Sequence, residues 1–379
     1  MSAMTGRERL LTALRGGEPD RVPVWLWGIR PGLPGKHPSI QPVVDAYLDR
    51  SDLMVWWGGF RSLFLTAADV PSHTATRPCR LPDYQETVTT WQTPAGALTR
   101  VVYTSPVGRP AYVHKQMLET RDDVERFLSV EYVPPRPDCA SFFELDGELG
   151  DRGLPIAQTI CDPMYALNRI TGSETFALWS VEERDLIDEV IALFTERILA
   201  YTRWLVARGV GPLFGYVGPE LCIPPLQSPA DFERWVVAPD RQIADLIHEA
   251  GGLMLVHCHG GLDPVLEGFV RMGADALHPI EPPMRDGTGM AGCVTLADAK
   301  RRVGDDLCIV GNTRHHDIET MPPAQFREMI AETIRVGMEG GGFILSPTAT
   351  PFGWPTMTDR ARENWLNMLD VALEVGRYE

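Results

Sequence analysis

The sequence has little positive charge and no long apolar run, and both absences narrow what the protein can do. Its 35 lysines and arginines stand against 51 acidic residues, giving a net charge of −16 and a pI near 5.0. Such a surface argues against binding nucleic acid or an anionic membrane. No uncharged apolar stretch approaches the ~20 residues that a transmembrane helix needs, so we expect a soluble protein.

Signal-peptide features and paired cysteines are also absent. Residues 1–8 lack the apolar core of a secretory signal, which predicts a cytoplasmic protein. Seven cysteines are scattered along the chain without a CxxC pair. This distribution is typical of free thiols in a reducing compartment rather than of a disulfide framework.

Short apolar runs alternate with helical patterns along the chain. Thr5-x-x-Glu8 is a capping box, and it predicts a helix over residues 5–16. Predicted strands lie at 21–27, 53–57, 154–160, 212–217, 253–257, 276–280, 307–310 and 343–346. Eight βα units predict a closed (β/α)8 TIM barrel, forming one domain over residues 1–379. A doubly wound open sheet is the alternative, but no strand runs directly into a G-x-G-x-x-G turn.

The periodicity changes between residues 84 and 117. Two alternating runs, 86–91 and 98–103, flank the turn sequence Thr93-Pro94-Ala95-Gly96. This pattern predicts a β-hairpin, an antiparallel insertion rather than part of the parallel sheet.

The apolar run 253–256 stops abruptly at His257-Cys258-His259-Gly260. In alternating β/α folds the carboxyl ends of the strands open into the ligand crevice, which places both imidazoles where such folds put their chemistry. Residues i and i+2 of a strand share a face, so the two rings can converge while Cys258 points away. We interpret the pair as metal ligands. The alternative is that they only hydrogen-bond neighbouring loops.

Other polar residues follow the neighbouring predicted strands. Glu220 comes directly after strand 212–217 and is our candidate for a third metal ligand, with Cys222 as the alternative. Three protein ligands with one open position are typical of catalytic zinc. We assign catalytic roles to Glu220, His257 and Asp162. The residues assigned to substrate binding are Trp27, Arg30, Glu281 and Asn312, and a loop salt bridge is an equally good interpretation of Glu281.

Several motifs carry a resemblance to a known family. They are Arg7-Glu8-Arg9-Leu10, Pro19-Asp20-Arg21-Val22-Pro23-Val24, the histidine strand with Gly260, Gly273-Ala274-Asp275-Ala276-Leu277, Gly311-Asn312 and Gly342-Phe343-Ile344-Leu345-Ser346-Pro347. With them, nearly the whole chain resembles the uroporphyrinogen decarboxylase superfamily, which also contains zinc-dependent, corrinoid-linked methyltransferases. The resemblance implies a (β/α)8 barrel, in agreement with the strand count.

The two branches of the superfamily imply different chemistry. The decarboxylase branch is metal-free and holds its polyacidic substrate with an Arg-rich loop, a Tyr and a late His; here that loop offers Arg30, Asn168 stands in place of the Tyr, and the late strand has no His. The methyltransferase branch binds zinc through His-x-Cys and a later Cys. Here His257-x-His259 and Ala349 stand at those positions, which favours a harder metal site and an oxygen substrate.

Three hypotheses follow from these patterns. The first is a zinc-dependent methyltransferase that moves a methyl group between a methoxyl or thiol small molecule and a corrinoid carried by a separate protein. The second is a metal-free, uroporphyrinogen decarboxylase-like lyase. The third is a non-catalytic binding barrel, which ranks last because the rim is richer in polar residues than packing requires. The oligomeric state stays open, with a homodimer as one option.

Overall fold

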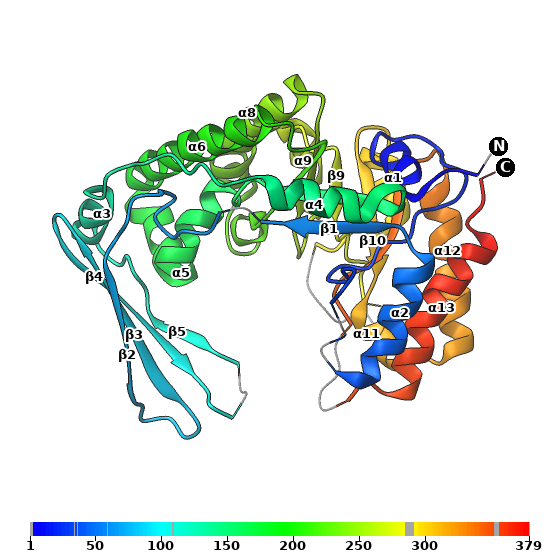
Figure 1. The fold of residues 1–379 in the computed structure, drawn as a ribbon, viewed down its shortest axis with the longest axis horizontal. Coiled ribbons are helices and arrows are strands. Elements are labelled where there is room, and N and C mark those ends of the chain that lie inside the picture. Colours follow the sequence, from blue (N-terminus) through cyan, green and yellow to red (C-terminus); the bar gives the residue numbers. More distant parts are fainter. Residues whose placement is uncertain are drawn as a thin grey trace. The chain divides into compact units, whose positions relative to one another are not determined.

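The computed structural model describes residues 3–33, 35, 37–58, 60–107, 110–284, 292–351 and 356–378 (Figure 1). The chain divides into two compact units. The first comprises Met1–Gly59, Asp138–Asp162 and Thr202–Glu379, and the second Phe60–Pro137 and Pro163–Tyr201. This division does not test the expectation that residues 1–379 form one domain, which stays a prediction.

A curled, parallel, seven-stranded sheet forms the centre of the first unit (Figure 1). Its strands are β1 (Leu53–Trp57), β6 (Gly153–Gln158), β7 (Leu213–Val217), β8 (Leu253–His257), β9 (Ala276–His278), β10 (Cys308–Thr313) and β11 (Phe343–Pro347), adjacent in that order. Seven of the eight predicted strands are therefore present. All lie parallel, so their carboxyl ends meet at one edge of the sheet.

The predicted closure of the barrel is wrong, because residues 21–27 do not form a regular strand. This segment lies between the two edge strands and makes only isolated bridges, such as Val24 to Leu345 of β11. Pro23 has no N–H to donate. The N–H of Val24 donates to the Asp52 carboxylate, 3.1 Å away, instead of to a backbone carbonyl. The sheet is barrel-like but open, since two ladder donors are lost at this seam.

Helices of the first unit cover the sheet. The capping box at Thr5 and Glu8 is confirmed at the start of α1 (Gly6–Leu14). In Figure 1, α12 lies beside α13, which also packs on α2. The other helices of this unit are α2 (Gln41–Arg50), α4 (Ala140–Leu149), α7 (Pro229–Phe232), α8 (Ala238–Glu249), α9 (Leu266–Met272), α10 (Leu296–Val303), α11 (His315–Thr320), α12 (Pro323–Met338) and α13 (Asp359–Val375). Short turns of helix are η1 (Pro38–Ile40), η2 (Gly150–Arg152), η3 (Pro219–Cys222), η4 (Glu233–Val237) and η5 (Asp263–Val265).

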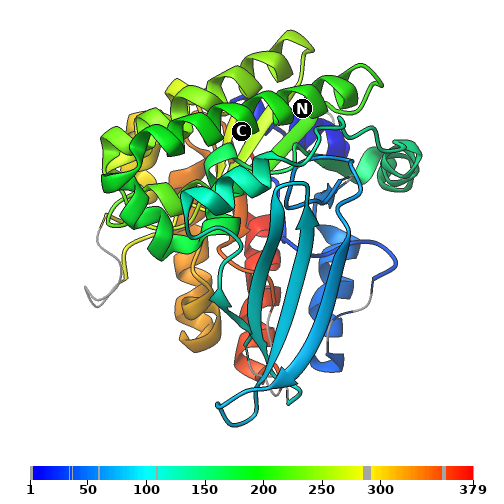
Figure 2. The same cartoon turned by 90° about the vertical axis from the view of Figure 1, so that its left-hand side faces the viewer.

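The second unit carries the predicted hairpin within a larger antiparallel sheet (Figure 2). Its strands are β2 (Ser72–Pro78), β3 (Gln85–Thr93), β4 (Gly96–Thr104) and β5 (Tyr112–Lys115). The predicted hairpin corresponds to β3 and β4. Its helices are α3 (Arg121–Leu128), α5 (Pro163–Glu182) and the part of α6 (Arg184–Val206) that ends at Tyr201. Across the described residues, no helix is long and apolar enough to cross a membrane.

Candidate active site

The carboxyl edge of the parallel sheet brings imidazoles from two strands together. Register pairing sets Val217 of β7 beside His257 of β8, and His257 beside His278 of β9. The rings of His257 and His278 stack with centroids 5.0 Å apart, and the ring of His259 meets that of His257 at 4.6 Å. Cys258, between the two histidines of β8 and its following loop, is fully buried. The polar groups of this strand therefore lie at its end, as its sequence indicates.

His278 is the residue that sequence reasoning missed. The strand was predicted to continue to Ile280, but it ends at His278. The signal was Pro279, since a proline following the histidine disfavours further ladder pairing. The ring of His278 is 1% exposed and its Nδ1 lies 2.8 Å from Nδ1 of His257. Burial lowers the pKa of His278 to about 3, and it also lowers the pKa of His257 well below the ordinary value of 6.5.

Glu281 holds the second imidazole of the motif. Its Oε1 lies 3.5 Å from Nδ1 of His259, and its Oε2 accepts a hydrogen bond of 3.1 Å from the backbone N–H of Gly260. Burial raises the pKa of Glu281, but the bonds from His259 and Gly260 outweigh it and the net shift is downward. These contacts agree with the loop salt bridge proposed for Glu281 and give it the position of a support for His259.

Glu220 lies on η3, immediately after β7. One of its carboxyl oxygens, Oε2, is buried and has no hydrogen-bond partner among the described residues. Burial raises the pKa of Glu220, and the opposing influence of His259 shows that the two side chains lie within electrostatic reach. A buried carboxylate oxygen without a partner is costly, so it favours a ligand at this place. The alternative metal ligand, Cys222, is fully buried.

Asp162 follows β6 and is fully buried. It lies close to Asp240 of α8, since its charge adds to burial in raising the pKa of Asp240 well above 3.8. Burial raises the pKa of Tyr216 on β7, and the charges of Asp240 and Asp162 raise it further. Asp162 also acts on the thiol of Cys258, whose pKa is raised mainly by burial. Asp162 thus belongs to a buried polar cluster beside the histidine strand.

Three tryptophans form a wall next to His257. The Trp27 ring stands edge-on to the His257 ring, with centroids 4.2 Å apart. Trp27 stacks between Trp25 and Trp56, at 5.8 and 5.3 Å. Trp25 is buried, whereas Trp27 and Trp56 are only partly buried. The wall therefore offers aromatic surface beside the imidazoles.

The two remaining predicted substrate contacts lie differently. Asn312 is 8% exposed, and its Nδ2 donates a 2.7 Å hydrogen bond to the carbonyl of Ile280, which ties β10 to the segment carrying Glu281. Arg30 is exposed on the loop after residues 21–27. The structure thus groups Trp27, Glu281 and the two motif histidines, but no described side-chain contact joins Arg30 to them.

The chemistry of the donor set fits a zinc ion. Two imidazoles and a carboxylate are the ligands of many catalytic zinc sites. Within the part of the chain that the structure describes, however, no three His, Cys, Asp or Glu side chains are already arranged as a metal site. Binding an ion between Glu220, His257 and His259 would therefore require these side chains to move together, and the unpartnered oxygen of Glu220 gives that movement a physical reason.

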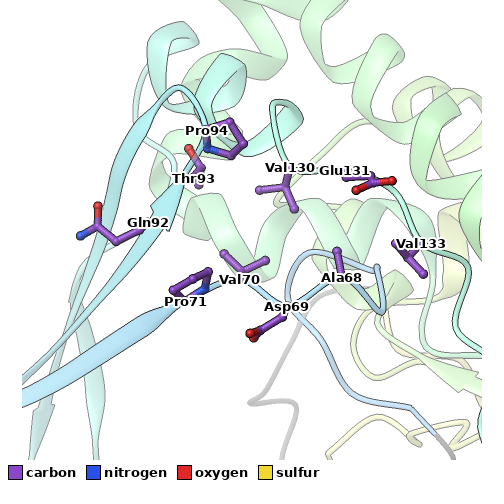
Figure 3. A pocket seen from close by; sticks show the side chains of 10 residues that line it. All are labelled: Ala68, Asp69, Val70, Pro71, Gln92, Thr93, Pro94, Val130, Glu131 and Val133. Atoms are coloured by element: carbon purple, nitrogen blue, oxygen red, sulfur yellow. The ribbon is translucent and has the colours of Figure 1, made fainter.

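A hollow of about 560 Å³ lies in the second unit, between the segment before β2, the β3–β4 turn and the segment after α3 (Figure 3). Of its ten lining residues, only Asp69 and Glu131 are ionisable, and both are exposed. This hollow lacks the convergence of buried groups found at the sheet edge.

The parallel sheet and its polar carboxyl edge define an open, barrel-like α/β fold, and comparison with known proteins shows the family. The uroporphyrinogen decarboxylase (URO-D) family model matches residues 147–356, and the chain belongs to this family. Two curated relatives are similar, both named methylcobamide:CoM methyltransferase MtaA, from Methanosarcina barkeri and its strain Fusaro. Each is 22% identical over 194 residues, which is 51% of this chain and 52% of the relative.

A solved structure extends the likeness to nearly the whole chain. It is a methyltransferase from Methanosarcina mazei, 17% identical, with a TM-score of 0.59 over 98% of this chain and 99% of that one. At this identity the similarity concerns the fold. The match covers 98% of this chain, so the likeness in fold is not confined to the residues that the family model matches.

Proposed function

We propose that this protein is a zinc-dependent methyltransferase that moves a methyl group between a methoxyl or thiol small molecule and a corrinoid carried by a separate protein. The observation that carries the proposal is the Oε2 of Glu220, which is buried and has no partner among the described residues, within electrostatic reach of His259 at the edge of the sheet where the rings of His257 and His259 converge. The relatives named as methylcobamide:CoM methyltransferases support the direction of the chemistry.

The residues of the chain divide the work. Glu220, His257 and His259 would hold zinc, which when bound supplies Lewis acidity toward a thiol or ether oxygen. The Glu281 carboxylate contacts Nδ1 of His259 and holds that ring in place. Because the pKa of Glu281 is lowered, its carboxylate is charged at neutral pH. His257 stays uncharged because burial lowers its pKa, so its ring keeps a lone pair for a cation.

The surroundings of the site suit a small, largely apolar substrate. The partly exposed Trp27 and Trp56 offer ring faces next to His257, and a methyl or aromatic group can pack on them. Nitrogen and oxygen donors make a harder site than one containing thiolates, which favours an oxygen-bound methyl group over a thiol. A methoxylated small molecule is therefore the first substrate class to test.

A decarboxylase acting on a polyacidic tetrapyrrole is the second candidate, and the family model's own description favours it. That reaction needs several fixed cations around the substrate carboxylates. Arg30 is exposed on its loop, and the Nε of Arg314 already donates to the carbonyl of Pro282. The net charge of −16 would also repel such a substrate at long range. These features place decarboxylation below methyl transfer.

Metal content tests the site. We expect purified protein to carry about one zinc per chain and His257→Ala to weaken zinc binding by ~10-fold or more. Glu220→Gln should also weaken binding while leaving the circular dichroism spectrum unchanged. His316→Gln, a change at an exposed histidine, is the matched control. Full zinc content in the His257→Ala/His259→Ala double variant would remove the metal assignment.

Methyl transfer tests the reaction. The purified protein is incubated with methylcobalamin and a thiol, or with cob(I)alamin and methoxylated aromatics, and the corrinoid spectrum is followed. We expect exchange that depends on Glu220 and His257. In a parallel assay with uroporphyrinogen we expect no coproporphyrinogen. Efficient coproporphyrinogen formation by metal-stripped protein would instead establish the decarboxylase.

A further inference from the structure

We infer that His278 is a positioning residue that fixes the tautomer of His257, so that Nε2 of His257 carries the free lone pair. The inference concerns a residue outside the three candidate metal ligands. Its value for catalysis rests on the proposed function, but the hydrogen-bond chain that carries it does not.

The chain of hydrogen bonds starts at the backbone carbonyl of Pro347 in β11. Nε2 of His278 lies 3.2 Å from the oxygen of Pro347, and a carbonyl oxygen can only accept. The same nitrogen lies 3.2 Å from Oγ of Ser346, whose hydroxyl is 3.3 Å from the Pro347 oxygen and can donate to it. Both contacts are satisfied when Nε2 of His278 carries a hydrogen. The opposite tautomer would set a nitrogen lone pair against the carbonyl lone pairs.

The second step concerns the other nitrogen of the same ring. His278 is 1% exposed and lies 5.1 Å from the Trp25 ring and 5.4 Å from the Trp27 ring, where an extra charge is costly. Within the described part of the chain its ring hydrogen-bonds Pro347, Ser346 and His257, none of them an anion, and the Glu281 carboxylate acts on it only as a more distant charge. The buried ring is therefore neutral, and because its single hydrogen is on Nε2, its Nδ1 has none.

The third step passes this choice to His257. Its Nδ1 lies 2.8 Å from Nδ1 of His278, a hydrogen-bonding distance at which two bare nitrogens would repel. His257 must therefore donate from Nδ1. Because a neutral imidazole has a single N–H, Nε2 of His257 is left as an acceptor. Supporting groups that orient a ligand histidine in this way commonly decide its basicity and direction.

The sheet is what makes the chain of bonds possible. His257 and His278 are register partners on β8 and β9, whereas Pro347 ends β11, which is separated from β9 by β10. The curl of the sheet carries the end of β11 over to His278. A flat sheet would leave His278 without the carbonyl that determines its tautomer.

Nitrogen-15 NMR of histidine-labelled, metal-free protein tests the inference directly. Long-range proton–nitrogen correlations show which ring nitrogen is protonated, and loss of one signal set in His257→Gln assigns that residue. We expect His257 to be protonated at Nδ1 in the wild type and in His278→Asn, whose side-chain oxygen can replace the acceptor. In His278→Phe we expect the Nε2–H form to become the major one. His316→Gln should leave the pattern unchanged.

Two results would overturn the inference: an Nε2–H tautomer of His257 in the wild type, or an unchanged Nδ1–H tautomer in folded His278→Phe. The wild-type measurement decides even where His278→Phe does not fold. Zinc titration adds a second readout, with a loss of ~10–100-fold in affinity for His278→Phe and near-complete rescue in His278→Asn. Because the tautomer is read without metal, failure of the zinc or methyltransferase proposal stays distinguishable from failure of this one.

Discussion

The two sheets of this protein place polar groups in opposite environments. Polar residues at the parallel sheet are buried: Asp52, immediately before β1, and His278, at the end of β9, are each 1% exposed. In the antiparallel sheet β2 is exposed along its whole length, and most residues of β3 and β4 are partly exposed. Its strands are joined by threonine pairs such as Thr74–Thr89 and Thr87–Thr104, at 3.1 and 3.0 Å. Polar residues in the first sheet should therefore control stability and chemistry, whereas those in the second should be replaceable at little cost.

Removing Asp52 should give the largest effect. Its carboxylate accepts bonds of 2.7 Å from Arg9 and 2.8 Å from Arg21, as well as the Val24 N–H. Asp52→Ala removes the carboxylate that pairs with the partly buried Arg21 and one of the two carboxylates that pair with Arg9, which keeps Asp20, and should destabilise the first unit by about 3–5 kcal/mol. Denaturant unfolding followed by tryptophan fluorescence measures it. Asp370→Ala, which breaks a half-exposed pair with Arg50, is the control. Similar midpoints for both variants would refute the contrast.

Lowering the pH should give the next largest loss of stability. The pKa of His278 is about 3 in the folded protein, below its ordinary value of 6.5. The unfolded chain therefore binds a proton first, so the contribution of His278 is complete above about pH 6.5 and falls away toward about pH 3, by on the order of 4 kcal/mol. His278→Asn cannot titrate and should show a shallower decline in unfolding midpoint between these limits. Parallel declines in both proteins would contradict this account.

A methyl group added at Gly215 of β7 should have an intermediate effect. Its Cβ would lie 2.7 Å from Cγ2 of Ile156 and 2.8 Å from Cη2 of Trp56. Gly215→Ala should cost about 1–3 kcal/mol by overpacking and displace Trp56 from its stack on Trp27, which changes tryptophan fluorescence. Gly147→Ala on α4, where the new Cβ meets nothing within 4 Å, is the control. An unchanged spectrum in Gly215→Ala would show that the wall can absorb the methyl group.

Changes on the antiparallel sheet should have the smallest effect. Glu86 of β3 pairs with Arg77 of β2, whose side chain is 64% exposed. Surface ion pairs of this kind are screened by solvent and contribute little. Glu86→Gln should leave the unfolding midpoint within experimental scatter at low and high salt. A clear destabilisation that disappears at high salt would show that this sheet depends on its charges after all.

The sequence predicted the strands of the parallel sheet because a strand buried on both faces has a strong apolar signal, as in residues 253–256. It could not predict β2, whose side chains are all exposed and show no alternation. The prediction of a strand over residues 21–27 was wrong. These residues have the composition of a strand, but Pro23 and the hydrogen bond from the Val24 N–H to Asp52 prevent a regular ladder. That competition depends on a carboxylate 28 residues away along the chain.

The site shows the same division. The sequence alone determined that a buried strand ends at His257 with His259 just beyond it, and that Glu220 follows the neighbouring strand, because apolar runs and strand order are local properties. Only the tertiary structure set His278 against His257 and the Pro347 carbonyl against His278. Those contacts join strands far apart in sequence, and on our inference the hydrogen bonds that they make, not composition, decide which nitrogen keeps its proton.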